Sequence, residues 1–159
     1  MATTDSGTLK ELVITRVFDA PVDLVWRAWT EPALLARWWG PRHFSNPRCE
    51  LEAKPGGRMH IDMRHDRDGA VYPMTGTVRE AVRGERLVFT NNALDAAGAP
   101  MIEGLTTVTF ERQGERTKVT VRATISKATP DGLAALEGME QGWNESLDKL
   151  AEDLAKEAR

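Results

Sequence analysis

Hydrophobic periodicity changes twice along this chain, and this pattern constrains the fold more than any other feature. Apolar residues between Val22 and Trp38 recur at helical spacing, whereas segments from Arg48 to Ser126 alternate between apolar and polar residues. After Thr129 the helical spacing returns. Because a helix repeats about every 3.6 residues and a strand every two, we expect short helices, then a set of strands, then a long helix.

The N-terminal part predicts one strand followed by two short helices. Lys10–Asp19 contains β-branched residues suited to a strand. A helix begins at Ala20-Pro21, where proline is tolerated because the first N–H groups of a helix have no partner. Its apolar face runs through Val22–Trp29. Glu31-Pro32 begins a second short helix, and Gly40-Pro41 ends it.

The middle of the chain predicts an antiparallel sheet. Alternation is clear after the turn at Pro55-Gly56-Gly57, and a shorter strand is expected at Leu87–Phe89. Two later strands, about Leu105–Glu111 and Lys118–Ser126, flank the turn signal Gln113-Gly114-Glu115. Short connections with this alternation are typical of antiparallel strands that cover an apolar core on one face.

The C-terminal segment predicts one long amphipathic helix. Thr129-Pro130 provides an N-cap and a proline at the first helical position. An apolar stripe through Leu136, Trp143 and Leu154 continues the helix to about Ala158. The fold class is therefore α+β: a curled antiparallel sheet of six to seven strands around this helix. Residues 1–8 are expected to be a flexible tail, and residues 9–159 a single domain.

Charge and cysteine content exclude several classes of protein. The 159 residues carry a net charge of −3 and a pI near 5.7, which argues against binding to nucleic acid. No apolar run approaches the roughly 20 residues that insert across a bilayer. Cys49 is the single cysteine, so an internal disulfide is impossible and a cytoplasmic location is expected.

Six short motifs occur in a fixed order along most of the chain. They are Val25-Trp26-x-Ala28-Trp29-Thr30-Glu31-Pro32, Trp38-Trp39-Gly40-Pro41, Pro55-Gly56-Gly57-Arg58, Tyr72-Pro73-Met74-x-Gly76, Glu85-Arg86-Leu87-Val88-Phe89-Thr90 and Gly142-Trp143-x-x-x-Leu147-Asp148-x-Leu150. In this order they resemble the helix-grip (START-like, SRPBCC) superfamily, and within it the domain family named after an activator of a heat-shock chaperone ATPase. The resemblance implies a cavity between the sheet and the C-terminal helix.

Relatives in that superfamily bind lipids, sterols, polyketides or other apolar molecules, so the resemblance implies a small hydrophobic ligand. Methionine suits such a site because its flexible side chain packs against different shapes. The alternative for each residue is an ordinary core position. The residues expected to border the cavity are Trp39, Met59, Ile61, Met63, Tyr72, Met74, Phe89, Phe110, Met139 and Trp143.

Candidate catalytic and metal-binding residues are few. No nucleophile elbow, phosphate loop, dinucleotide fingerprint or zinc motif occurs. Glu140 is the one candidate catalytic group, because it lies about 40° from Leu136 on a helical projection and burial would raise its pKa. The cluster of His60, Asp62, His65 and Asp66 is better explained as solvated residues around a hairpin than as a metal site. We expect no cofactor and no metal.

Three functions therefore remain open at this point. The first is binding of a small apolar molecule without turnover, as a carrier or sensor. The second is a cyclase- or hydrolase-type enzyme that uses a carboxylate or histidine in the cavity. The third is a modulator of a chaperone or another partner protein. Gly138 and Gly142 are expected to face away from the apolar stripe, and this predicts a homodimer that packs against them.

Overall fold

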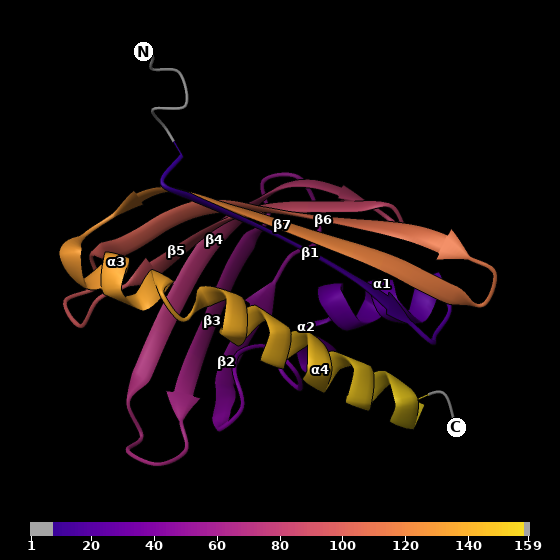
Figure 1. The fold of residues 1–159 in the computed structure, drawn as a ribbon, viewed down its shortest axis with the longest axis horizontal. Helices are drawn as coiled ribbons and strands as arrows, with labels where there is room; N and C mark the ends of the chain where they lie inside the picture. Colours follow the sequence, from indigo (N-terminus) through magenta and orange to yellow (C-terminus); the bar gives the residue numbers. More distant parts are fainter. Residues whose placement is uncertain (1–7, 158–159) are drawn as a thin grey trace.

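The computed structural model describes residues 8–157, and its helices and strands follow the expected order (Figure 1). The predicted tail, residues 1–8, lies outside the described residues except for residue 8. The elements are β1 (Lys10–Phe18), α1 (Val22–Thr30), α2 (Pro32–Leu35), β2 (Phe44–Leu51), β3 (Arg58–His65), β4 (Val71–Val82), β5 (Arg86–Leu94), β6 (Pro100–Gln113), β7 (Arg116–Ala128), α3 (Pro130–Leu136) and α4 (Met139–Glu157).

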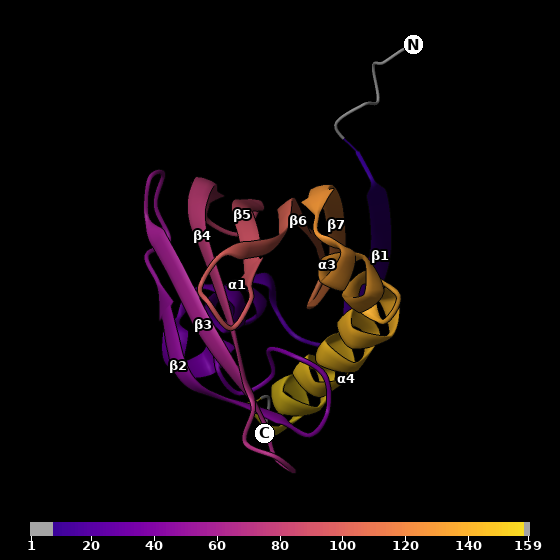
Figure 2. The same ribbon diagram turned by 90° about the vertical axis from the view of Figure 1, so that its left-hand side faces the viewer.

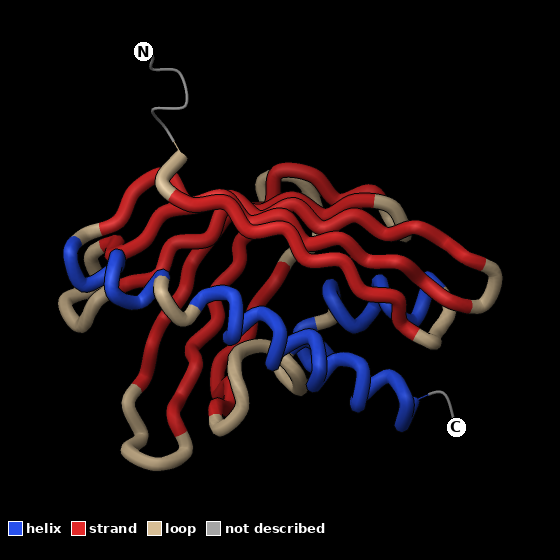
Figure 3. Tube along the Cα trace, in the orientation of Figure 1, coloured by secondary structure: helices blue, strands red, loops and turns tan. Residues whose placement is uncertain are grey.

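A single antiparallel sheet forms the body of the molecule, which confirms the predicted fold class. Its seven strands lie in the order β1-β7-β6-β5-β4-β3-β2, so the first strand of the chain pairs with the last. Figure 2 shows the sheet curving into an arc whose concave side faces α3 and α4. The helices therefore lie on one side of the sheet, as Figure 3 also shows with helices in blue and strands in red.

Several strands are longer than the alternation predicts. β5 extends past the expected Phe89 through Asn91 and Asn92, and β6 begins at Pro100 rather than near Leu105. Asparagine and proline are disfavoured in strands, so the pattern alone ends these segments early. Pairing with the neighbouring strands on both sides supplies the stability that these residues lack locally.

The prediction of one continuous C-terminal helix is wrong. α3 ends at Leu136, residues 137–138 form a turn, and α4 begins at Met139. The N–H groups of Glu137 and Gly138 donate to carbonyls three residues earlier, at 3.3 and 3.2 Å, which is the tighter 3₁₀ pattern. Glycine weakens a helix by about 1 kcal/mol relative to alanine, so Gly138 favours the break. The predicted cap is confirmed: the Thr129 hydroxyl accepts from Gly132 N–H at 3.2 Å.

Tryptophans of α1 and of the turn after α2 fill one end of the space between sheet and helices. Trp29 and Trp38 are at most 1% exposed, and their ring centroids lie 4.6 Å apart in an edge-on arrangement. Trp38 Nε1 donates to the Ala28 carbonyl at 3.0 Å, which satisfies its buried N–H. Phe110 from β6 packs edge-on against Trp26 and Trp29. This end of the molecule is therefore a closed aromatic core.

Candidate functional site

A cleft of about 290 Å³ lies at the other end of the same space, between the concave face of the sheet and α3 and α4. Its sheet wall combines inward-facing residues from five strands, β3 to β7. These residues are Met63, Met74, Asn91, Ala93, Ile102 and Ile125. Because alternate residues of a strand face opposite sides, each strand contributes one or two side chains to this wall.

The helical wall of the cleft is built from the end of α3 and the first two turns of α4. Leu136, Met139 and Trp143 supply apolar side chains there. Gly138 and Gly142 also line the cleft, so the prediction that they face away from the core is wrong. The turn at residues 137–138 interrupts the helix. A helical projection that treats residues 130–158 as one continuous helix therefore places the residues after the turn on the wrong face. The hypothesis of a homodimer was based on these two glycines facing outward, so it no longer has a supporting observation.

The segment Trp39-Gly40-Pro41 closes the side of the cleft between sheet and α4. Gly40 has a φ of +91°, which favours glycine, and a Cβ there would lie 2.8 Å from Met63 Sδ and displace the end of that side chain. Trp39 packs edge-on against Trp143, with ring centroids 5.5 Å apart. Asn46 Nδ2 holds this segment by donating to the Trp39 carbonyl at 2.8 Å.

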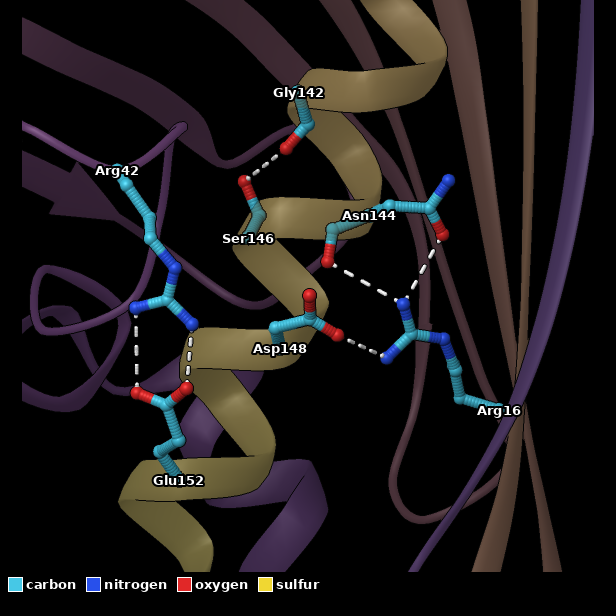
Figure 4. A network of polar contacts seen from close by, with 7 residues as sticks. All are labelled: Arg16, Arg42, Gly142, Asn144, Ser146, Asp148 and Glu152. Atoms are coloured by element: carbon cyan, nitrogen blue, oxygen red, sulfur yellow. Dashed lines mark hydrogen bonds and ion pairs between the residues drawn. The ribbon is translucent and has the colours of Figure 1, made fainter.

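Polar contacts fix α4 against its surroundings on two sides (Figure 4). On one side, Arg16 of β1 donates to Asp148 at 2.9 Å and to the Asn144 side chain at 3.1 Å. On the other, Arg42 pairs with Glu152 and donates its backbone N–H to Glu145 at 3.0 Å. These contacts hold the wall of the cleft at a defined distance from the sheet and from the Pro41 segment.

The contacts around Arg42 change the pKa values of three neighbouring side chains. The hydrogen bond from Arg42, together with its charge, lowers the pKa of Glu152 below its ordinary value of 4.5. Hydrogen bonds from the Gln141 side chain and the Arg42 backbone lower the pKa of Glu145. Burial, assisted by the charge of Arg42, lowers the pKa of Lys149, whose ammonium donates to the Pro41 carbonyl at 3.3 Å.

Two polar side chains face the cleft among the described residues that line it, Asn91 and Ser146. The Asn91 side-chain oxygen accepts from the hydroxyl of Thr106 at 2.8 Å. The Ser146 hydroxyl donates to the Gly142 carbonyl at 2.9 Å, one turn earlier in α4. The lining is otherwise apolar side chains and glycine.

Of the residues expected to border a cavity, the structure brings five together around the cleft: Trp39, Met63, Met74, Met139 and Trp143. The other five lie elsewhere. Met59, Ile61, Phe89 and Phe110 are packed in the buried core. Tyr72 is 45% exposed and pairs with Met63, so it shares the concave face but lies further along the β3–β4 hairpin.

Candidate catalytic and metal-binding residues lie outside the cleft. Glu140 is exposed on α4. His60 Nε2 lies 2.8 Å from Asp62 Oδ1, on the sheet face opposite the cleft. Within residues 8–157, no group of three or more histidine, cysteine, aspartate or glutamate side chains is arranged to hold a metal ion. Burial raises the pKa of the Cys49 thiol to about 11, so this cysteine is protonated at neutral pH.

Asn91, Ala93, Gly138 and Gly142 were not among the residues expected at the site. Asn91 carried a usable signal, because an amide between strand segments that alternate so clearly is unusual. The glycines carried a weaker one, since glycine within a helix usually marks a close approach. Gly142 does not meet that description strictly, because a Cβ there would make an ordinary contact of 3.6 Å with Pro41 Cγ.

The fold and the order of its motifs match one protein family. The family model described as "Activator of Hsp90 ATPase homolog 1-like protein" matches residues 19–155. The chain belongs to this family. The resemblance inferred from the six motifs is thereby confirmed. Among proteins of curated function, none matches the sequence significantly.

Solved structures show how widely the AHSA1-like fold is shared. A crystal structure from Nitrosomonas europaea is 27% identical, with a TM-score of 0.77 over 93% of this chain and 96% of that chain. A solution structure from Arthrobacter aurescens is also 27% identical, with a TM-score of 0.82 over 97% of this chain and 90% of that one. An AHSA1 protein from Silicibacter pomeroyi, 24% identical with a TM-score of 0.79 over 93% and 99%, shows the same fold.

No helix within residues 8–157 of this AHSA1-like chain combines the length and the apolar character needed to cross a bilayer.

Proposed function

We propose that this protein binds a small apolar molecule in the cleft between the sheet and α3 and α4, and acts as a carrier or sensor. The observation that carries the proposal is the lining: three methionines and two tryptophans surround a space of about 290 Å³. Binding sites for small molecules are concave, mostly apolar and about 300–1,000 Å³ in volume. The cleft lies at the lower limit of this range, which suits a small molecule of one to three rings.

The methionines support a site that adapts to its ligand. Met63, Met74 and Met139 come from three different elements, β3, β4 and α4. An unbranched thioether side chain changes rotamer at low cost and packs well against aromatic rings. Trp39 and Trp143 add flat, rigid surfaces to the same lining. This combination favours planar apolar ligands over branched aliphatic ones.

We propose binding without turnover and without a cofactor. Among the described residues that line the cleft, none is a carboxylate, histidine, cysteine or lysine. General acid–base catalysis needs a titratable group within hydrogen-bonding reach of the substrate. Glu140, the one candidate from the sequence, is exposed rather than in the cleft. No observation favours the cyclase- or hydrolase-type alternative.

A fluorescence titration with N-phenyl-1-naphthylamine, an uncharged three-ring probe (a naphthalene joined to a phenyl ring), tests the proposal. We expect saturable binding to the wild type. Met74→Trp should abolish it, because the larger side chain fills the cleft. Val13→Trp is the matched control, since Val13 is 56% exposed on the outer face of β1. Absence of saturable binding to the wild type, or equal binding by both variants, would contradict the proposal.

The natural ligand would be sought by mass spectrometry of material extracted from the purified, denatured protein.

A cytoplasmic location is proposed as well, because Cys49 has no second cysteine with which to form an internal disulfide. The family's name refers to activation of a chaperone ATPase. Modulation of a chaperone stays a hypothesis that this name suggests, and no contact in the structure favours it over binding of a small molecule.

A further inference from the structure

Asn91 stands out among the residues of the cleft because it is a carboxamide in an apolar wall. It lies on β5 between Phe89, which is fully buried, and Ala93, which lines the cleft. All three face the concave side, since they alternate along the strand. An amide at such a position lowers the stability of the core unless its polar atoms find partners. We therefore ask which hydrogen-bond partners the oxygen and the nitrogen of the Asn91 side chain have.

One half of the Asn91 side chain is satisfied within the protein. The hydroxyl of Thr106, on the neighbouring strand β6, donates to Asn91 Oδ1 at 2.8 Å. Thr106 is fully buried, so its hydroxyl has no access to solvent. A buried hydroxyl is costly to leave unpaired, and this bond therefore fixes the orientation of the amide. Asn91 Oδ1 then points toward the sheet.

The other half of the side chain is left for a ligand. With Oδ1 engaged, Nδ2 presents two N–H donors. No hydrogen bond from Nδ2 to another described residue is found. Gly104 lies opposite Asn91 in the strand pairing, and a Cβ at Gly104 would lie 3.6 Å from Nδ2 and 2.6 Å from the Thr124 carbonyl. Glycine at this position thus keeps the space around the amide open.

Ser146, the second polar side chain of the cleft, has the opposite character. Its hydroxyl hydrogen is used by the Gly142 carbonyl at 2.9 Å, so toward the cleft it can only accept. Ser146 lies on α4 and Asn91 on the facing sheet. The two polar groups therefore differ: Asn91 on the sheet offers hydrogen-bond donors to the cleft, whereas Ser146 on α4 offers only an acceptor.

We propose that Asn91 selects ligands that carry a hydrogen-bond acceptor, such as a ketone or other carbonyl oxygen, on an otherwise apolar ring system. This inference rests on the proposed function, because it names the chemical class of the molecule bound in the cleft. The apolar part contacts the methionines and tryptophans, and the carbonyl oxygen accepts from Asn91 Nδ2. A neutral hydrogen bond of this kind corresponds to about a tenfold preference over the analogue that lacks the acceptor.

The test compares 1-tetralone with tetralin, two bicyclic molecules that differ in a single carbonyl group. Each is titrated as a competitor against bound N-phenyl-1-naphthylamine, and the ratio of their dissociation constants is the readout. The wild type should bind 1-tetralone about tenfold more tightly than tetralin. In Asn91→Leu/Thr106→Val, both hydrogen-bonding partners are replaced by apolar groups of similar size. That double variant should lose the preference for 1-tetralone or favour tetralin, because a carbonyl buried without a donor costs free energy.

Two further variants separate the donor from other effects. Asn91→Asp keeps the size and the acceptor for Thr106 but removes the N–H donors, so the preference for the ketone should be lost. Asn92→Leu is the matched control, because Asn92 is the next residue of β5 and pairs with Thr75 and Glu103 on the outer face. This control should keep the wild-type ratio.

The outcomes distinguish the inference from the function on which it rests. If N-phenyl-1-naphthylamine binds the wild type but 1-tetralone and tetralin compete equally, the role of Asn91 is overturned and the binding function stands. An unchanged ratio in Asn91→Asp overturns it as well. If neither the probe nor the competitors bind the wild type, the proposed function itself fails.

Discussion

The space between the concave sheet and the helices differs at its two ends. Beneath α1, Trp29 and Trp38 are at most 1% exposed and the aromatic rings are in direct contact. Beneath α3 and the start of α4, a cleft of about 290 Å³ remains, and Met63 and Met139 are only partly buried. The same sheet and the same C-terminal segment bound both ends.

Side-chain size accounts for the difference. The closed end is filled by indole rings, which are the largest apolar side chains available. The open end has Ala93 on the sheet and Gly138 and Gly142 on the helical side. Small residues on facing walls leave space that flexible methionines fill only in part. Trp39 and Trp143 also border the cleft, so the small residues on its facing walls, rather than a lack of indoles, account for the space that remains there.

The largest expected effect contrasts a truncation at each end. Trp38→Ala should lower the free energy of unfolding by about 3–5 kcal/mol, since it removes a fully buried indole and leaves a cavity. Met63→Ala should cost about 1 kcal/mol, because the space it vacates is continuous with the cleft. Urea denaturation of both variants measures the contrast. Equal losses would mean that the two ends are packed alike.

The second prediction tests whether Gly40 keeps the cleft open on the side of Met63. Gly40→Ala should cost about 1–2 kcal/mol, because φ is +91° there. Its Cβ would also push Met63 Sδ, 2.8 Å away, into the cleft and weaken binding of N-phenyl-1-naphthylamine. Gly56→Ala is the control, with a φ of +85° and no atom within 4 Å of the added Cβ. The control should lose similar stability but keep its affinity, and a loss of affinity in both would contradict this account.

The third prediction is that a substitution at Gly142 has opposite effects on the stability of the protein and on its affinity for the probe. Gly142→Ala should raise the free energy of unfolding by about 0.5–1 kcal/mol, because alanine favours the helix and its Cβ would make an ordinary 3.6 Å contact with Pro41. The same methyl group should reduce affinity for the probe. Gly132→Ala is the contrasting case, since a Cβ there would lie 2.2 Å from the Met101 carbonyl and should destabilise the protein. Destabilisation by Gly142→Ala would show that this helix position needs glycine for another reason.

The smallest effect concerns the ion pair that holds α4 to the Arg42 segment. Arg42 lowers the pKa of Glu152 below 4.5, so the carboxylate is favoured in the folded state. The stability from this pair is present above about pH 4.5 and is lost as the pH falls through the lowered pKa. Glu152→Gln should therefore be slightly less stable than the wild type near neutral pH, and the two should converge in acid. Urea denaturation across this range checks the convergence, and a constant difference would contradict it.

The sequence predicted the fold well because the fold depends on periodicity. The alternation around Met63 and Met74 identifies the inner face of the sheet, and the spacing of apolar residues after Thr129 identifies the helix that covers it. Such patterns are local and survive in any arrangement that buries one face. The break after Leu136 was missed because a single glycine has only a small effect on the pattern.

The candidate site was harder to predict, because alternation shows which face a residue occupies but not how far along the groove it lies. Phe110 and Met63 both face inward, yet Phe110 packs against Trp29 and Met63 lines the cleft. That distinction depends on where α1 packs, which no local pattern encodes. Asn91 was overlooked for a related reason: its partner Thr106 is remote in sequence and adjacent only in the sheet.

The pairing of the first strand with the last has a consequence for synthesis on the ribosome. β1 forms its ladder only with β7, with Lys10 opposite Ile125 and Phe18 opposite Thr117. The strands β2 to β6 can pair with sequence neighbours as they emerge, but β1 has to wait for a segment made some hundred residues later. Contacts that join such distant segments slow folding. The complete seven-stranded sheet, and with it the wall that α4 presents to the cleft, therefore forms only after nearly all of the domain has been translated.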